Sequence, residues 1–124
     1  HARGIDLVLN KGRLGECYNI GGINEWANID IVNLICELMN EAFANDASLA
    51  AKYPEAIKAM DGKAQELITY VTDRAGHDQR YAINPTKSND ELGYEPAESF
   101  ETGIRKTINW YLSESDWWTP LLVK

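Results

Sequence analysis

The chain has 124 residues, of which 44% are hydrophobic and 25% charged, and its formal net charge is −7. This size and composition suit one compact globular domain. An acidic chain without a Lys- or Arg-rich block excludes nucleic acid and anionic membranes as expected partners. No apolar run approaches the roughly 20 residues that cross a bilayer, and the first residues do not form a signal peptide.

The two cysteines, Cys17 and Cys36, lie in apolar segments and lack the spacing of a metal or redox pair. We expect them to be buried free thiols in a reducing compartment. Together with the lack of a signal peptide, this predicts a cytoplasmic protein.

The first half of the chain predicts two helices and one strand. Residues 2–10 form the end of an amphipathic helix that Gly12 terminates. Residues 16–20 are expected to form a short strand. Apolar residues at helical spacing predict a second helix over residues 29–43, and Asn28 is expected to cap it.

The second half begins with a polar, alanine-rich excursion over residues 44–66, which is expected to hold one short helix near residues 54–60. The further predicted elements are a strand over residues 67–71, an extended piece over 80–83, a helix from Asn84-Pro85 to Leu92-Gly93, and a final helix capped by Ser99. The order predicts an α/β fold with too few strands for a complete nucleotide-binding sheet.

One loop has the chemistry of an anion site. Arg74, Gly76 and His77 follow the predicted strand within four residues. The arginine presents a planar pair of donors that matches phosphate oxygens, the glycine allows a tight turn, and the histidine adds a donor. From the residues alone, the alternative is a set of solvated surface charges, paired with neighbouring aspartates.

Two further positions are weaker candidates. Asn28 stands at a predicted helix N-terminus, which favours anions, although the residues alone favour a simple helix cap. Arg105 and Lys106 are expected to face solvent.

Nothing in the sequence forms a catalytic centre. The glycines do not have the dinucleotide-binding spacing, no tyrosine has a lysine four positions later, and His1 and His77 lack partners at metal-ligand spacing. We therefore expect no catalytic, cofactor-binding or metal-binding residue in this chain.

Several ordered motifs carry a family resemblance. They are Gly15-Glu16-Cys17-Tyr18-Asn19-Ile20-Gly21-Gly22, Asn28-Ile29-Asp30, Ile68-Thr69-Tyr70-Val71-Thr72-Asp73-Arg74, Gly76-His77-Asp78, Arg80-Tyr81-Ala82-Ile83, Glu91-Leu92-Gly93-Tyr94 and Phe100-Glu101-Thr102-Gly103-Ile104-Arg105-Lys106-Thr107. In this order they resemble the C-terminal part of dTDP-glucose 4,6-dehydratases, members of the extended short-chain dehydrogenase/reductase superfamily. The resemblance covers nearly the whole chain apart from residues 44–66.

The resemblance implies a fold and a role for the chain. Residues 1–124 would be a single partial domain, the small mixed helix–strand lobe that binds the nucleotide-sugar, with the Rossmann core missing. It implies that Arg74, His77 and Asn28 bind the diphosphate of a dTDP-sugar.

The same resemblance implies what lies outside the chain. The NAD site, the tyrosine–lysine pair and the acid residues for elimination would lie upstream of His1, in an NAD domain that is the lobe's partner and that forms a homodimer. The parent enzyme would form dTDP-4-keto-6-deoxyglucose, while this lobe would not catalyse alone. Two alternatives stay open: the lobe of a UDP- or GDP-sugar epimerase or dehydratase, and a stand-alone binding module.

Overall fold

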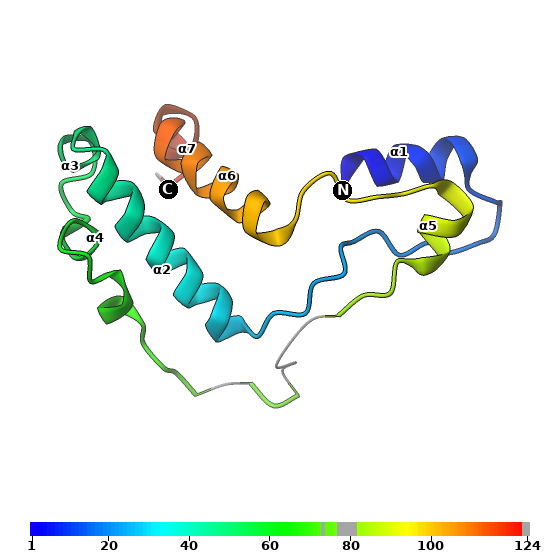
Figure 1. Cartoon of the computed structure of the whole chain (residues 1–124), viewed down its shortest axis with the longest axis horizontal. Helices are drawn as coiled ribbons and strands as arrows, with labels where there is room; N and C mark the ends of the chain where they lie inside the picture. The colour runs from blue at the N-terminus through cyan, green and yellow to red at the C-terminus, as the bar shows by residue number, and fades with distance from the viewer. Residues whose placement is uncertain (73, 77–81, 123–124) are drawn as a thin grey trace.

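The computed structural model describes residues 1–72, 74–76 and 82–122. In this part of the chain every regular element is helical. The elements are α1 (Ala2–Lys11), α2 (Asn28–Asn45), α3 (Ser48–Lys52), α4 (Ile57–Met60), the 3-10 helix η1 (Ala64–Leu67), α5 (Thr86–Leu92), α6 (Phe100–Ser113) and α7 (Ser115–Leu122). Figure 1 shows two packed groups: α2 with α3, α4, α6 and α7, and a smaller pair of α1 and α5, joined by extended segments.

The larger group is built on the apolar face of α2. The buried residues of its core are Phe43, Leu49, Ala59 and Ala64, and partly buried residues of the same helix, among them Cys36 and Met39, pack against them. The predicted helical spacing of apolar residues therefore identifies the face that the structure buries. η1 and α4 pack on one side of α2, and α6 packs on the other.

The smaller group depends on a close approach between α1 and the segments around α5. Gly4 is buried, and a Cβ atom at this position would lie 2.4 Å from the Ile20 side chain and 2.9 Å from the Tyr94 ring. Leu92, the last residue of α5, and Tyr94, two residues later, are both buried. Gly93 ends α5 with a φ of 67°, in the left-handed region that favours glycine.

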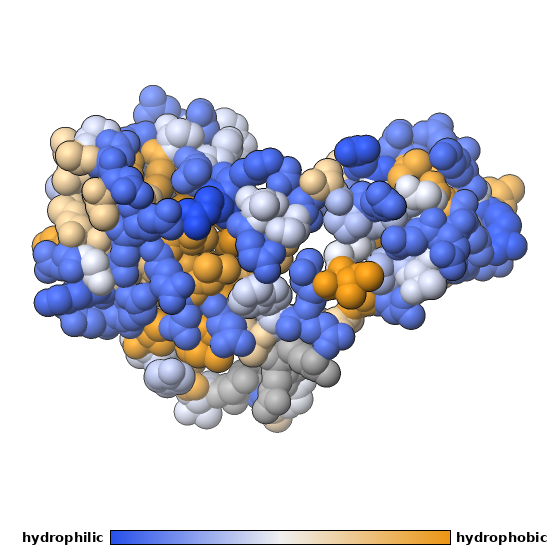
Figure 2. All heavy atoms as spheres, viewed as in Figure 1, coloured by the Kyte–Doolittle hydropathy of each residue, from blue (hydrophilic) through white to orange (hydrophobic). Residues whose placement is uncertain are grey.

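The chain exposes much more surface than a compact protein of its mass. Its accessible surface is 9479 Å², whereas a compact monomer of 13.9 kDa exposes about 6,700 Å². Large apolar side chains are exposed over both groups, among them Leu9, Leu14, Tyr70, Val71 and Trp117. Figure 2 shows the narrow connection between the two groups and the apolar side chains that reach the surface.

Most predicted helices and three of their end signals are confirmed. Gly12 follows α1, Gly93 follows α5, and the backbone N–H of Thr102 donates to Ser99 Oγ (3.2 Å) at the start of α6. The apolar positions of α6 also behave as expected at Ile108, which is buried.

The predicted strands are not formed, so the mixed helix–strand architecture is not confirmed. Residues 16–20 and 68–71 are neither helix nor strand, and Leu67 ends η1. A strand needs a neighbour whose backbone groups complete its hydrogen bonds, and these segments do not pair with each other. Of the extended piece predicted over residues 80–83, residues 80 and 81 lie outside the described part of the chain.

Three local predictions are wrong in detail. Ala27, rather than Asn28, is the N-cap of α2, and Asn28 is its first helical residue. The predicted helix near residues 54–60 is the single turn α4, because the preceding α3 stops before Pro54 and the chain becomes helical again only at Ile57. The thiol of Cys17 is exposed rather than buried, and that of Cys36 is half-buried.

Among the described residues, no helix combines the length and the apolar character that crossing a membrane requires.

Candidate functional site

Arg74 follows the extended residues 68–72 that leave η1, and it lies on the surface. Gly76 has a φ of 76°, so the chain turns here through a conformation that suits glycine. The turn expected after Arg74 is therefore present. His77, the second candidate on this loop, lies outside the described residues.

Asn28 is exposed at the first position of α2, a helix of 18 residues. The backbone N–H groups of a first helical turn have no carbonyl partners one turn earlier, and the helix dipole adds partial positive charge. Because its side chain does not cap the helix, Asn28 is an exposed amide beside these donors. Asp30 shares the first turn and places a carboxylate near the same end.

The segment that carries Arg74 is long enough to span the part of α2 between Asn40 and Asn28. η1 is fastened to α2 at Asn40, whose Oδ1 accepts from the Ala64 N–H (3.0 Å). Asn40 is 12 residues after Asn28, a distance of about 18 Å along the helix. Arg74 is six residues after Ile68, so a fully extended chain would span at most about 20 Å between them. Figure 1 shows this segment leaving η1 in the direction of the N-terminal end of α2.

The other end of the loop is fastened to the segment that leads into α2. Asn19 donates from Nδ2 to the Asn84 carbonyl (3.1 Å). Ser88 is fully buried, and its hydroxyl lies within hydrogen-bonding distance of the carbonyls of Asn19 and Pro85. These contacts hold residues 19–21 against the start of α5, so both flanks of the Arg74 loop are anchored in packed structure.

A network of charges joins the loop after α1 to α5. Arg13 Nη2 lies 2.6 Å from Glu91 Oε1, and the Tyr18 hydroxyl donates to Glu91 Oε2 (2.7 Å). Tyr18 first, and Arg13 in addition, lower the pKa of Glu91. Lys87 pairs with Glu16 at 2.5 Å and lowers the pKa of that carboxyl. These groups satisfy one another, so we assign them to packing rather than to ligand binding.

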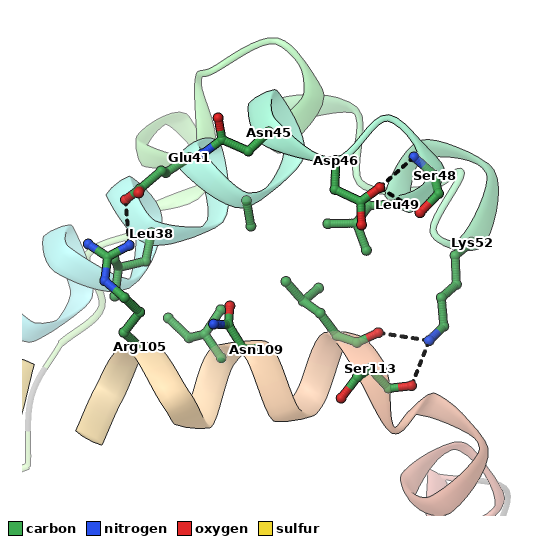
Figure 3. A pocket seen from close by; sticks show the side chains of 13 residues that line it. Leu38, Glu41, Asn45, Asp46, Ser48, Leu49, Lys52, Arg105, Asn109 and Ser113 are labelled. Atoms are coloured by element: carbon green, nitrogen blue, oxygen red, sulfur yellow. Dashed lines mark hydrogen bonds and ion pairs between the residues drawn. The ribbon is translucent and has the colours of Figure 1, made fainter. Parts of the chain in front are cut away.

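A cavity of about 500 Å³ lies elsewhere, between α2, α3 and α6. Figure 3 shows its two cations, each already engaged: Arg105 pairs with Glu41 (2.8 Å), and Lys52 Nζ donates to the carbonyls of Leu112 and Ser113 (both 2.8 Å). Neither Arg74 nor Asn28 lines this cavity. We take the Arg74 loop as the candidate ligand site because an arginine beside a tight turn has the chemistry of a phosphate site.

No group of three His, Cys, Asp or Glu side chains in the described ranges could hold a metal ion.

Asn40 is a residue of this region that no sequence motif singled out. Its signal is a polar residue among Cys36, Met39 and Phe43, on the face of α2 that the apolar spacing predicts to be buried. A polar group in such a position is normally hydrogen-bonded within the protein, and Asn40 is bonded to Ala64 and Gln65.

Comparison with known proteins gives the family. A family model described as GDP-mannose 4,6 dehydratase matches residues 1–107. The chain belongs to the GDP-mannose 4,6 dehydratase family. The resemblance to the C-terminal part of dTDP-glucose 4,6-dehydratases is also confirmed.

Curated proteins that are similar to this chain include a probable dTDP-glucose 4,6-dehydratase of Sinorhizobium fredii, 49% identical over 98% of this chain, and a dTDP-glucose 4,6-dehydratase of Escherichia coli, 48% identical over 98%. The chain covers 30% and 31% of these two proteins. It thus spans about a third of the length of the curated relatives that it matches.

A solved structure agrees with the family assignment. The dTDP-glucose 4,6-dehydratase of Bacillus anthracis in complex with NAD is 40% identical, with a TM-score of 0.68 over 98% of this chain and 31% of that one. The helix-rich arrangement of the chain therefore resembles about a third of that larger dehydratase.

Proposed function

We propose that this chain is the nucleotide-sugar-binding part of an NAD-dependent dTDP-glucose 4,6-dehydratase that forms dTDP-4-keto-6-deoxyglucose. The relatives that support this proposal carry that name and are 40–49% identical to the chain. The part of the protein outside this chain supplies the NAD site, because the glycines of this sequence do not form a dinucleotide-binding loop.

Arg74, His77 and Asn28 hold the diphosphate in this proposal. The observation that carries it is the match between the reach of the Arg74 segment and the length of α2 from Asn40 to Asn28, about 20 Å against about 18 Å. Arg74 then contributes two parallel hydrogen bonds to phosphate oxygens. The first turn of α2 contributes backbone N–H groups, and the Asn28 amide contributes a further donor.

The exposed apolar surface supports a larger protein around this lobe. Leu9 and Leu14 near α1, and Tyr70 and Val71 beside the Arg74 loop, are apolar side chains that a neighbouring domain would cover. We propose that the NAD-binding part packs here, closes the substrate site and forms the homodimer of the whole enzyme. The free thiols of both cysteines suit the cytoplasm.

A second candidate substrate is a GDP- or UDP-sugar. The family model that matches the chain is described by GDP-mannose, and a diphosphate site alone does not distinguish the bases. We favour the dTDP-sugar because the similar relatives named above act on dTDP-glucose by name.

Calorimetric titration with thymidine diphosphate tests the diphosphate site. Arg74→Ala should weaken binding by about 10- to 100-fold, which corresponds to the 1.5–3 kcal/mol of hydrogen bonds to a charged group. Arg105→Ala is the matched control, because Arg105 is also an exposed arginine but lies in the other cavity, away from Asn28. Equal weakening by both substitutions, or no binding by the unsubstituted chain, would contradict an autonomous site at Arg74. Parallel titrations with guanosine and uridine diphosphates rank the bases.

A further inference from the structure

We propose that Asn40 is a positioning residue that sets the place of the Arg74 segment relative to the N-terminal end of α2. The geometrical part of this inference stands on the structure of the chain. Its consequence for diphosphate binding rests on the proposed function.

Asn40 connects α2 to η1 through both atoms of its amide. Its Oδ1 accepts from the backbone N–H of Ala64 (3.0 Å), and its Nδ2 donates to Gln65 Oε1 (2.9 Å). The Gln65 carbonyl then accepts from the Ile68 N–H (3.1 Å), at the start of the extended segment that leads to Arg74. One side chain on α2 thus begins a short chain of hydrogen bonds that ends where this segment leaves η1.

The bond to Ala64 is expected to dominate. Ala64 is only 5% exposed, so its N–H would lose its partner in a dry environment if Asn40 were removed. A buried donor without a partner costs more than the bond itself contributes, and the chain relieves that cost by moving the donor toward water. Loss of the Asn40 amide should therefore displace or loosen η1 rather than leave it unchanged.

The other polar link to η1 is weaker. Lys58 on α4 pairs with Glu66, but both side chains are about half exposed (43% and 53%). Solvent screens an exposed ion pair of this kind, so the pair contributes little to fixing the position of η1. Packing of Ala64 against Phe43 and Ala59 keeps η1 near α2, whereas the directional bonds of Asn40 set its orientation.

Asn40 lies on the helix that carries Asn28 and binds the element that leads to Arg74, so it connects both sides of the proposed site. The same helix carries Asn28 at its start, about 18 Å away. Arg74 is six residues after Ile68, and a fully extended chain could reach at most a similar length. A change in the orientation of η1 therefore changes the direction in which the segment toward Arg74 starts, while Asn28 stays in place. In this arrangement α2 acts as a rigid support for both ends of the proposed diphosphate site.

Distance measurement by electron paramagnetic resonance tests the inference without a ligand. Spin labels at Asp30→Cys and Ala75→Cys, in a Cys17→Ser, Cys36→Ala background, leave Asn28 and Arg74 unchanged. We expect a narrow distance distribution in this chain and a broader or shifted one after Asn40→Ala.

The controls separate positioning from folding. Asn45→Ala removes the same amide from an exposed position of the same helix and should leave the distribution unchanged. Asn40→Asp keeps an oxygen acceptor for the Ala64 N–H and should restore most of the narrow distribution. Gln65→Ala removes only the second bond, so it reports on orientation even if Asn40→Ala folds poorly. An unchanged distribution in both Asn40→Ala and Gln65→Ala would overturn the inference.

Titration of the same variants with thymidine diphosphate connects position to binding. Asn40→Ala should weaken binding about tenfold although the charge of Arg74 is intact, and Asn40→Asp should recover much of the loss. If Arg74→Ala binds as well as the unsubstituted chain, the proposed function fails, and the spin-label distances still decide the role of Asn40. If Arg74→Ala loses binding and Asn40→Ala does not, the positioning role fails alone.

Discussion

Two glycines in two helices are predicted to respond to the same substitution with opposite signs. Replacing Gly4 in α1 or Gly103 in α6 with alanine increases the intrinsic helix propensity, by up to about 1 kcal/mol in a helix interior. The surroundings of the added methyl group differ. At Gly103 its contact is ordinary, with Glu98 Cβ at 3.7 Å, whereas at Gly4 it would meet Ile20 at 2.4 Å and Tyr94 at 2.9 Å.

The magnitudes decide the sign at each site. Gly103→Ala should raise the free energy of unfolding by about 0.5–1 kcal/mol, since nothing opposes the gain in propensity. Gly4→Ala pays for overpacking with about 1–3 kcal/mol. Because the Ile20 side chain lies directly against Gly4 and Tyr94 is buried, neither neighbour moves away easily. Gly4→Ala should therefore lower the free energy of unfolding by up to about 2 kcal/mol and weaken the packing of α1 against α5.

Urea unfolding followed by far-ultraviolet circular dichroism measures both changes. The midpoint should rise for Gly103→Ala and fall for Gly4→Ala, and the signals of Tyr94 in nuclear magnetic resonance spectra should shift only in the latter. If Gly4→Ala stabilised the chain as much as Gly103→Ala does, the close packing of α1 on Tyr94 would be refuted.

Two further predictions concern single groups. Cys17 is exposed and Cys36 half-buried, so a thiol reagent should label Cys17 faster in the native chain and both at similar rates in urea; faster labelling of Cys36 would contradict the structure. The Tyr18 hydroxyl lowers the pKa of Glu91 below its ordinary value of 4.5, so the stability that Glu91 contributes is present above pH 4.5 and is lost as the pH falls through the lowered pKa. Tyr18→Phe should raise this pKa in a carboxyl-detected titration, and an unchanged pKa would show that the bond is absent in solution.

The helices of this chain were predictable because their signals are local. Apolar spacing identified α2, a serine three positions before Thr102 identified the start of α6, and Gly93 identified the end of α5. These signals depend on backbone groups within one or two turns, so they operate whatever else the chain contacts.

The strands were not predictable from the same kind of evidence. Residues 16–20 and 67–71 have strand-like composition, but a strand exists only where another strand completes its hydrogen bonds. The chain spans about a third of its curated relatives. Residues 16–20 are held instead by side chains of α5, since Lys87 Nζ donates to the Cys17 carbonyl and the Ser88 hydroxyl donates to the Asn19 carbonyl.

The residue types of the candidate site were predictable from the sequence, but the contacts that hold these residues in place were not. Arg74 and Asn28 are suggested by residue type and by position next to a turn or a helix start. The bonds of Asn40 to η1 join residues 24 and 25 positions apart, and the pair of Arg13 and Glu91 joins residues 78 positions apart. Such pairs depend on how the helices pack, which no local pattern specifies.

The location of the diphosphate site is tested most directly by mapping amide chemical shifts during titration with thymidine diphosphate. The account predicts that the amides of Asn28, Ile29 and Gly76 shift together, with one saturation curve, and that Arg74→Ala abolishes the shifts. Shifts confined to residues around Lys52 and Arg105, in the cavity between α2, α3 and α6, would contradict it.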